Sequence, residues 1–333
     1  MRALIFLLLG GCLPDLGDRS AGSQEGECAS CHPDHTEQFA AAKHSRPSDT
    51  EVFLALRARA EVELGAGAFC DRCHLPDEGI SCLTCHAAAG NREIANGSLI
   101  EDRTGPMRGP WGDTTGPHAS VEGGLLTDSA LCGTCHEVQG LGGFEEHPYQ
   151  AWESSPSAAA GERCQDCHMS SEPGSSQGRV VGPISSGGEE RERSDHSFVG
   201  LQTDPLALLN RGVSLSVVGD GVALQNHAGH TLPDGAAFTR ELWLESREDG
   251  EWTGDRRALH PQLRTLGSPT WDPVLADEVL LRGVPAGAVR FEAYDTERFE
   301  VCLRFRPVSE ELSRGLGLPV SEAVTVVCAA PGL

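Results

Sequence analysis

Five copies of the pattern Cys-x-x-Cys-His, all within residues 28–168, constrain this chain more than any other feature of its sequence. The pattern is the attachment signature of c-type haem, in which two thiols bond to the porphyrin and the adjacent histidine ligates the iron. A zinc site needs no histidine after every second cysteine, and a disulfide framework has no use for histidine. We therefore expect five covalent haems c. The attachment cysteines are Cys28, Cys31, Cys70, Cys73, Cys82, Cys85, Cys132, Cys135, Cys164 and Cys167, and the proximal histidines are His32, His74, His86, His136 and His168.

Three cysteines remain outside these motifs. Cys12 follows Arg2, a short apolar run and Leu9-Gly-Gly, which is typical of a bacterial signal peptide ending in a lipobox. We expect residues 1–11 to be the signal peptide, Cys12 to be the lipid anchor and residues 12–27 to be a flexible tether; an ordinary cleaved signal peptide is the alternative. Both alternatives predict a periplasmic or cell-surface protein. In the lipoprotein case, the protein would be tethered to a membrane such as the outer membrane.

Cys302 and Cys328 would then lie in an oxidising compartment, where a disulfide is the natural pairing. Two buried free thiols are the alternative. On a strand, Cys302 shares a face with Glu300 and Arg304. A bridge to Cys328 is therefore predicted on the more polar face of a sheet.

The first part of the chain is too short to bury five porphyrins and also form a separate aliphatic core. It offers about 28 residues per haem (141/5) between Cys28 and His168. The haems must themselves form the core, wrapped by helices and loops. The net charge of −23 argues against nucleic acid and favours cationic redox partner proteins or membrane electron donors.

Helical and loop patterns occupy the segment 28–200. A helix is predicted from Ser48 to about Leu64, with a capping box of Ser48 and Glu51 and a stop at Gly65. The polar stretch 171–195, which ends in a charged run, predicts a mobile loop.

Period-two apolar patterns begin beyond residue 205, and a hairpin turn is predicted at Gly219-Asp-Gly221. The expected fold class is α + β. A mainly helical and loop multihaem domain (28–200) with little regular sheet precedes a small antiparallel β-sandwich domain (205–333). The strands are predicted at 213–217, 222–224, 241–245, 289–294, 299–305 and 324–328.

Each haem iron has a sixth coordination position. A second histidine there gives a low-potential electron carrier, and an open position gives a site where a small molecule can react. Eight histidines lie outside the motifs, enough for five haems that are mostly bis-His: His35, His44, His118, His147, His196, His227, His230 and His260.

Several blocks of the chain resemble the multihaem cytochromes c related to the tetrahaem cytochrome of bacterial ammonia oxidation. The most specific is Tyr149-Gln-Ala-Trp-Glu-Ser-Ser ahead of the last haem motif. Another is Asn226-His-Ala-Gly-His-Thr-Leu-Pro-Asp-Gly235, similar to the family's Asn-x-x-Gly-His-x-x-Pro-Thr-Gly element. Asp234 departs from the usual threonine there. Further matches are Phe39-Ala-Ala-Ala-Lys-His44, His118-Ala-Ser and His196-Ser-Phe-Val-Gly.

The resemblance implies that His44, His118, His196 and His230 are distal ligands; a surface or structural histidine is the alternative for each. Four candidates serve five irons, so one haem lacks an assigned distal ligand. His35, His147 and His227 are in reserve.

Two classes of function remain. One is an extracytoplasmic electron carrier with closely packed haems. The other is a haem enzyme, such as a reductase or oxidase of a small nitrogen or sulfur compound, that works at an open iron. Proton donors for such chemistry are sparse, since the chain has two tyrosines and a single lysine, Lys43. The carrier is therefore favoured, and the β domain could dock either protein to a larger complex.

Overall fold

A computed structural model describes residues 27–75, 79–113, 116–140, 142–172, 180–201, 204–265, 268–269, 273–274, 276, 278–279 and 283–330. The predicted signal peptide, Cys12 and almost all of the predicted tether lie outside these residues. Within them, no helix is both long and apolar enough to span a membrane.

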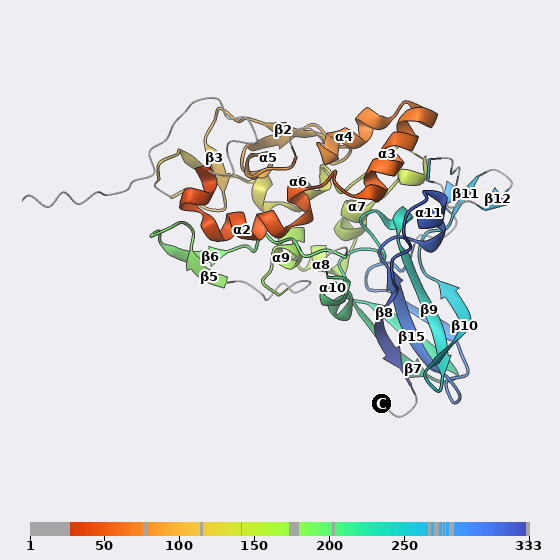
Figure 1. Ribbon diagram of the computed structural model, residues 1–333. Helices are drawn as coiled ribbons and strands as arrows, with labels where there is room; N and C mark the ends of the chain where they lie inside the picture. Colours follow the sequence, from red (N-terminus) through yellow and green to blue (C-terminus); the bar gives the residue numbers. More distant parts are fainter. Residues whose placement is uncertain are drawn as a thin grey trace, which may run out of the picture.

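Short helices joined by irregular segments make up the part of the chain that carries the five motifs (Figure 1). Its small strands pair only locally, as β1 with β2, β3 with β4 and β5 with β6. The helices are α2 (Pro33–Ala41), α3 (Glu51–Leu64), α4 (Gly67–His74), α5 (Cys82–His86), α6 (Ser129–Gly133), α7 (Pro148–Glu153), α8 (Pro156–Ala159), α9 (Cys164–His168) and α10 (Pro205–Gly212). The strands are β1 (Ala88–Asn91), β2 (Leu99–Glu101), β3 (Met107–Gly109), β4 (Ser120–Glu122), β5 (Val180–Pro183) and β6 (Glu190–Arg193).

Helix α3 begins two residues later than its capping pattern predicts. Its N-cap is Thr50, whose hydroxyl accepts a hydrogen bond from the Phe53 amide at 3.2 Å, so the expected Ser48 cap is wrong. The C-terminal end is as predicted, because Gly65 adopts a left-handed conformation (φ 63°) that suits glycine. A bidentate ion pair from Arg57 to Asp71, with both contacts at 2.5 Å, holds α3 against α4.

The polar stretch predicted as a loop contains the hairpin β5–β6. Two of its charged side chains form ion pairs with residues outside the hairpin. Arg191 bonds Asp113 at 2.7 Å, and Arg193 bonds Asp34 at 2.9 Å. The loop prediction is therefore wrong for residues 180–193, because these ion pairs fix a short charged ladder to the helical part.

Two antiparallel sheets follow α10, in the strand orders β14-β8-β7 and β10-β9-β15-β16. The hairpin β7–β8 turns at Gly219 (φ 59°), as its sequence predicts. The exposed strand β10 was not predicted, because its polar sequence lacks period-two alternation. These strands are β7 (Val213–Val218), β8 (Gly221–Asn226), β9 (Glu241–Glu248), β10 (Glu251–Ala258), β14 (Val289–Ala293), β15 (Glu300–Arg306) and β16 (Val324–Ala329); a small sheet of β11 (Leu263–Thr265), β12 (Ser268–Pro269) and β13 (Glu278–Val279) and the helix α11 (Glu310–Gly315) complete this part.

Both larger sheets contribute side chains to one hydrophobic cluster. Leu215 and Leu224 come from the first sheet, and Leu244, Leu303 and Phe305 come from the second. The cluster places the apolar faces of the two sheets together. The division into a haem domain and a β-sandwich domain stays a prediction.

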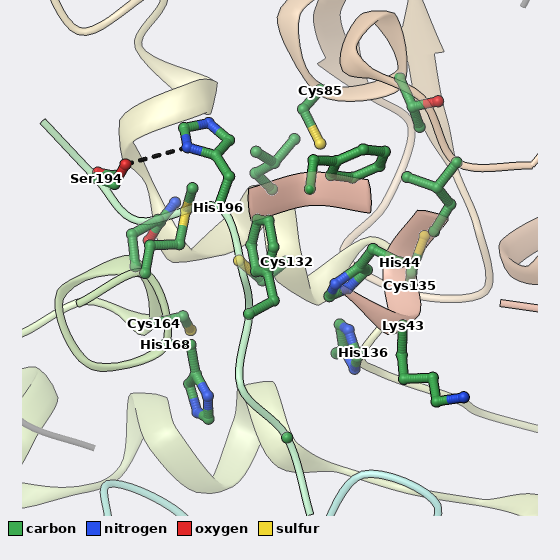
Figure 2. A pocket seen from close by; sticks show the side chains of 18 of the residues that line it. Lys43, His44, Cys85, Cys132, Cys135, His136, Cys164, His168, Ser194 and His196 are labelled. Carbon is green, nitrogen blue, oxygen red and sulfur yellow. Dashed lines mark hydrogen bonds between the residues drawn. The ribbon is translucent and has the colours of Figure 1, made fainter. Parts of the chain in front are cut away.

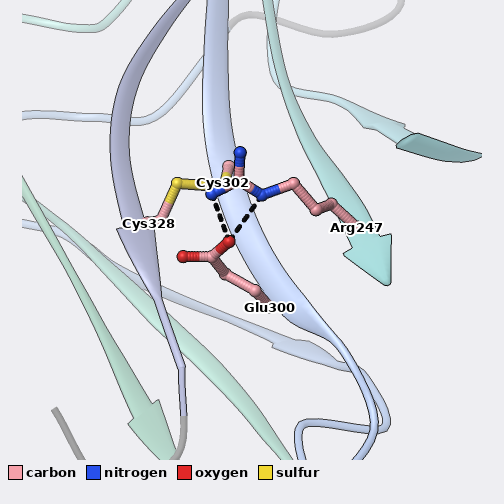
Figure 3. The surroundings of a disulfide bond; sticks show 4 residues. All are labelled: Arg247, Glu300, Cys302 and Cys328. Carbon is pink, nitrogen blue, oxygen red and sulfur yellow. Dashed lines mark hydrogen bonds and ion pairs between the residues drawn. A yellow bond between two sulfur atoms is a disulfide. The ribbon is translucent and has the colours of Figure 1, made fainter. Parts of the chain in front are cut away.

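A disulfide joins Cys302 of β15 to Cys328 of β16, which are directly opposite each other in the ladder. It lies on the face that carries Glu300 and Arg247, whose side chains are paired at 2.6 Å (Figure 3). The bridge is therefore formed, on the polar face that the strand alternation predicts.

Candidate functional site

Each Cys-x-x-Cys-His motif forms about one helical turn. The second to fifth motifs lie on α4, α5, α6 with the residues that follow it, and α9, and residues 27–31 form a turn ahead of α2. Residues three positions apart on a helix share a face. The two cysteine side chains of each motif therefore point to one side, with the histidine beside them.

A cavity of about 2200 Å³ connects all five motifs. Every one of the ten motif cysteines and five motif histidines lines it, as do His44, His118, His196 and His230. One continuous space is thus surrounded by the groups that the sequence predicts for haem attachment and ligation.

Four of the motif histidines face a second imidazole across this cavity; Figure 2 shows His44 beside His136. The ring centres lie 6.3 Å apart for His32 and His118, 5.9 Å for His136 and His44, 6.4 Å for His86 and His196, and 6.1 Å for His168 and His230. A metal bound by two imidazole nitrogens at about 2.0–2.1 Å each would place the ring centres about 6 Å apart. The spacing of all four pairs therefore fits one iron between two imidazoles.

Backbone carbonyls fix the tautomer of three motif histidines. The Nδ1–H groups of His32, His74 and His86 donate to the carbonyls of Ile184, Pro47 and Arg108, each at 2.6 Å. A donor at Nδ1 leaves Nε2 unprotonated on a neutral ring, which is the state that binds a metal. These hydrogen bonds also orient each ring.

Burial favours the neutral form of five of the imidazoles that line the cavity. Desolvation lowers the pKa of His44 and of His168 to about 4 and that of His196 to about 3, and like-charge repulsion from neighbouring histidines adds to it. The pKa values of His86 and His136 are lowered for the same first reason. Neutral rings are available as ligands at physiological pH without the loss of a proton.

His74 differs from the other four motif histidines. Its ring is stacked on Phe53 of α3, with centres 4.0 Å apart and planes 17° from parallel. Among the described residues, no second imidazole faces it. The aromatic ring nearest to His74 is thus that of Phe53. It covers the flat face of the imidazole, whereas a metal binds at the edge of the ring, at a nitrogen.

The three reserve histidines contact residues other than His74. His147 donates to Glu137 at 2.7 Å, His227 pairs with Ser214 at 2.8 Å, and His35 lies against His196 with ring centres 4.8 Å apart. None of them is brought to His74.

Contacts between motif thiols show which motifs are neighbours. The Cys73 thiol lies against Cys135, with its sulfur 3.9 Å from the Cys135 carbonyl. A hydrogen bond from the Cys132 thiol lowers the pKa of Cys164 to about 7. The fourth motif therefore contacts both the second and the fifth. This arrangement would bring the cofactors of the three motifs close together.

Comparison with known proteins gives one informative result. No protein-family model matches the chain, and no curated protein matches it. The solved structures include one similar chain, described as a penta-heme cytochrome c552 from Thermochromatium tepidum, with a TM-score of 0.65 and 18% sequence identity. The match covers 92% of this chain and 97% of that one. Both parts of the chain therefore share the fold of a pentahaem cytochrome c.

Some groups at this site had no signal in the sequence. The carbonyls of Pro47, Arg108 and Ile184 carry no side-chain pattern, and only the folded backbone brings them to the ring nitrogens. Phe53 is visible in the sequence as part of an apolar helix stripe. That pattern predicts packing, and it gives no indication of contact with His74.

Proposed function

We propose that the chain is an extracytoplasmic multihaem c-type cytochrome that carries electrons through five covalently attached haems. The observation that carries the proposal is the set of four imidazole pairs, each spaced for one iron, in a cavity lined by all ten motif cysteines. The fold similarity to a pentahaem cytochrome c552 supports it. Haem supplies a one-electron couple, and the protein sets its potential through the ligands.

Four of the five positions are proposed to be bis-His, with His118, His44, His196 and His230 as the distal ligands. Two neutral imidazoles saturate an iron, so these positions exchange electrons and bind no substrate. The neighbouring thiols of the second, fourth and fifth motifs support a chain of adjacent haems. Such a chain suits passage of electrons between a membrane donor and a partner with a cationic surface, since the protein carries a net charge of −23.

A second function is favoured by one observation at His74, the motif histidine that no imidazole faces among the described residues. The haem held by Cys70, Cys73 and His74 would then keep an open position. A small nitrogen or sulfur compound could bind there, which would make the protein a reductase or oxidase fed by the other four haems.

Spin-state counting tests both functions. Pyridine haemochrome analysis of the matured protein should give five haems per chain, and EPR of the oxidised protein should give four low-spin haems and one high-spin haem. His44→Ala should add one high-spin haem, whereas the control His147→Ala should add none, since His147 is bonded to Glu137. A count of four or fewer haems would contradict the cofactor assignment. Five low-spin haems would remove the open site and with it the enzyme.

A further inference from the structure

His35 lies one helical turn after the first haem motif, on α2, and lines the cavity. It is half-buried. Its ring makes an edge-to-face contact with His196, with centres 4.8 Å apart, and lies 6.1 Å from the ring of His32. His35 therefore lies between the ligands of two proposed haems.

The ring nitrogens of His35 form no hydrogen bond with any described residue. Three other histidines outside the motifs, none of them a proposed ligand, are hydrogen-bonded: His147 with Glu137, His227 with Ser214, and His260 with the Leu242 carbonyl at 3.0 Å. A neutral imidazole with uncommitted nitrogens is a ready metal ligand.

His196, by contrast, is held on an irregular segment that follows β6. Its Nδ1–H donates to the Ser194 carbonyl at 3.1 Å (Figure 2), and its backbone amide donates to the Gln38 side chain at 3.0 Å. Gln38 is one turn after His35 on α2. The same helix therefore holds the backbone of His196 and places a second imidazole against its ring.

We propose that His35 is an alternative sixth ligand for the haem iron at His86 and can take the place of His196. This inference rests on the proposed function. In the exchange the bond from iron to His196 breaks and a bond to His35 forms. One neutral imidazole replaces another, so no proton or electron is transferred. The ring displacement needed is on the scale of a side-chain rotamer change.

The other three distal histidines have no comparable neighbour. Among the described residues, the rings within contact of His44 are those of its partner His136 and of Phe198, and the ring within contact of His230 is that of its partner His168. The ring within contact of His118 is its partner His32. His35 also lies 6.1 Å from His32, so the clear contrast is with His44 and His230. Loss of either of these two ligands should open its iron, whereas loss of His196 should not.

The test compares single and double variants of the matured holoprotein by EPR at slightly acidic pH, where a water on the iron stays protonated and high-spin. His196→Ala should show the same number of high-spin haems as the wild type, with a shifted midpoint potential for one haem. His196→Ala/His35→Ala should show one more high-spin haem. His35→Ala alone should leave the count unchanged, and His44→Ala, the matched control, should raise it by one.

An additional high-spin haem in the His196→Ala single variant would overturn the inference and leave the proposed bis-His carrier intact. The same result would follow if His35 only bonded a haem propionate. An unchanged count in the double variant would show that His196 is not a ligand, which contradicts the proposed function instead. Haem content by pyridine haemochrome, and return of the double variant to the low-spin state on addition of imidazole, verify that the variants are folded.

Discussion

The imidazole of His230 lies 6.1 Å from that of His168 and 20° from parallel to it. His168 ends the last haem motif, whereas His230 belongs to the segment between β8 and β9. Asn226 holds this segment, since its side-chain amide donates to the carbonyls of His230 at 2.9 Å and Val284 at 2.8 Å. An iron between the two rings would join the haem-motif part to the β-sheet part by a metal bond.

His230→Ala should therefore open one haem and raise its midpoint potential, because loss of an imidazole donor destabilises oxidised iron. A metal–ligand bond also contributes to folding free energy, so limited proteolysis should release the C-terminal part faster. Redox titration and EPR check the first effect, and a protease time course checks the second. The control is His227→Ala, which should change neither potential nor spin count. Unmoved potentials in His230→Ala would mean that His230 is only a structural turn residue.

The lipid anchor at Cys12 gives a second prediction. Cys12→Ser should abolish incorporation of labelled fatty acid and shift the protein from the detergent phase to the aqueous phase. The physical reason is that acyl chains contribute about 0.8 kcal/mol per buried CH₂ to membrane binding. Cys302→Ala is the control and should keep the label. Equal partitioning of Cys12→Ser and wild type would remove the lipoprotein proposal.

Much of the site can be predicted from the sequence because covalent attachment needs cysteines and a histidine at fixed spacing. The distal positions are harder. His196 and His86 are 110 positions apart in the sequence (196 − 86), and only folding places their rings 6.4 Å apart. His44, His118, His196 and His230 could be selected from eight candidates only through a family resemblance, and as ligands they stay a prediction.

The fold shows the same division between local and distant information. The Gly219 turn and the Gly65 helix end are local signals, and the structure has both. The hairpin β5–β6 depends on ion pairs with Asp113 and Asp34, which are 78 and 159 positions away from Arg191 and Arg193. A sequence window on residues 180–193 contains neither partner, so it resembles a solvated loop.

The disulfide between Cys302 and Cys328 gives a third prediction. The bridge closes a loop with a sequence separation of 26. Its removal in Cys302→Ala/Cys328→Ala should lower the free energy of unfolding by about 2–4 kcal/mol, mainly because the unfolded chain gains entropy. Thermal melting followed by circular dichroism measures this, with haem content as the control, since no haem motif lies on these strands. An unchanged melting temperature would show that the sheet ladder alone holds β15 and β16 together.

Glu146 gives a fourth prediction, because desolvation and the nearby Asp234 carboxylate raise the pKa of Glu146 to about 8. Its Oε2 accepts from the Ala236 amide at 2.6 Å, while its buried Oε1 has no partner among the described residues. The folded state therefore favours the protonated acid. Its contribution to stability is complete below the ordinary carboxyl pKa of 4.5 and is lost as the pH rises through about 8.

Glu146→Gln should remove this loss, because the amide resembles the protonated acid and cannot ionise. The variant and the wild type should have the same free energy of unfolding at about pH 5. At about pH 9 the variant should be more stable by about 1–3 kcal/mol, a range that is reduced because the residue is partly exposed to solvent. Melting temperatures across this range check the prediction, with the exposed Glu297→Gln as a control whose pH dependence should follow the wild type. Parallel curves for Glu146→Gln and wild type would show that Glu146 is ionised in the folded protein at no cost. The wild type and Glu146→Gln share the same surroundings at this position, namely the charges of Asp234 and Arg240 and the backbone amides of Ala236 and Ala237. The difference between the two curves therefore reports the ionisation of the Glu146 carboxyl group alone.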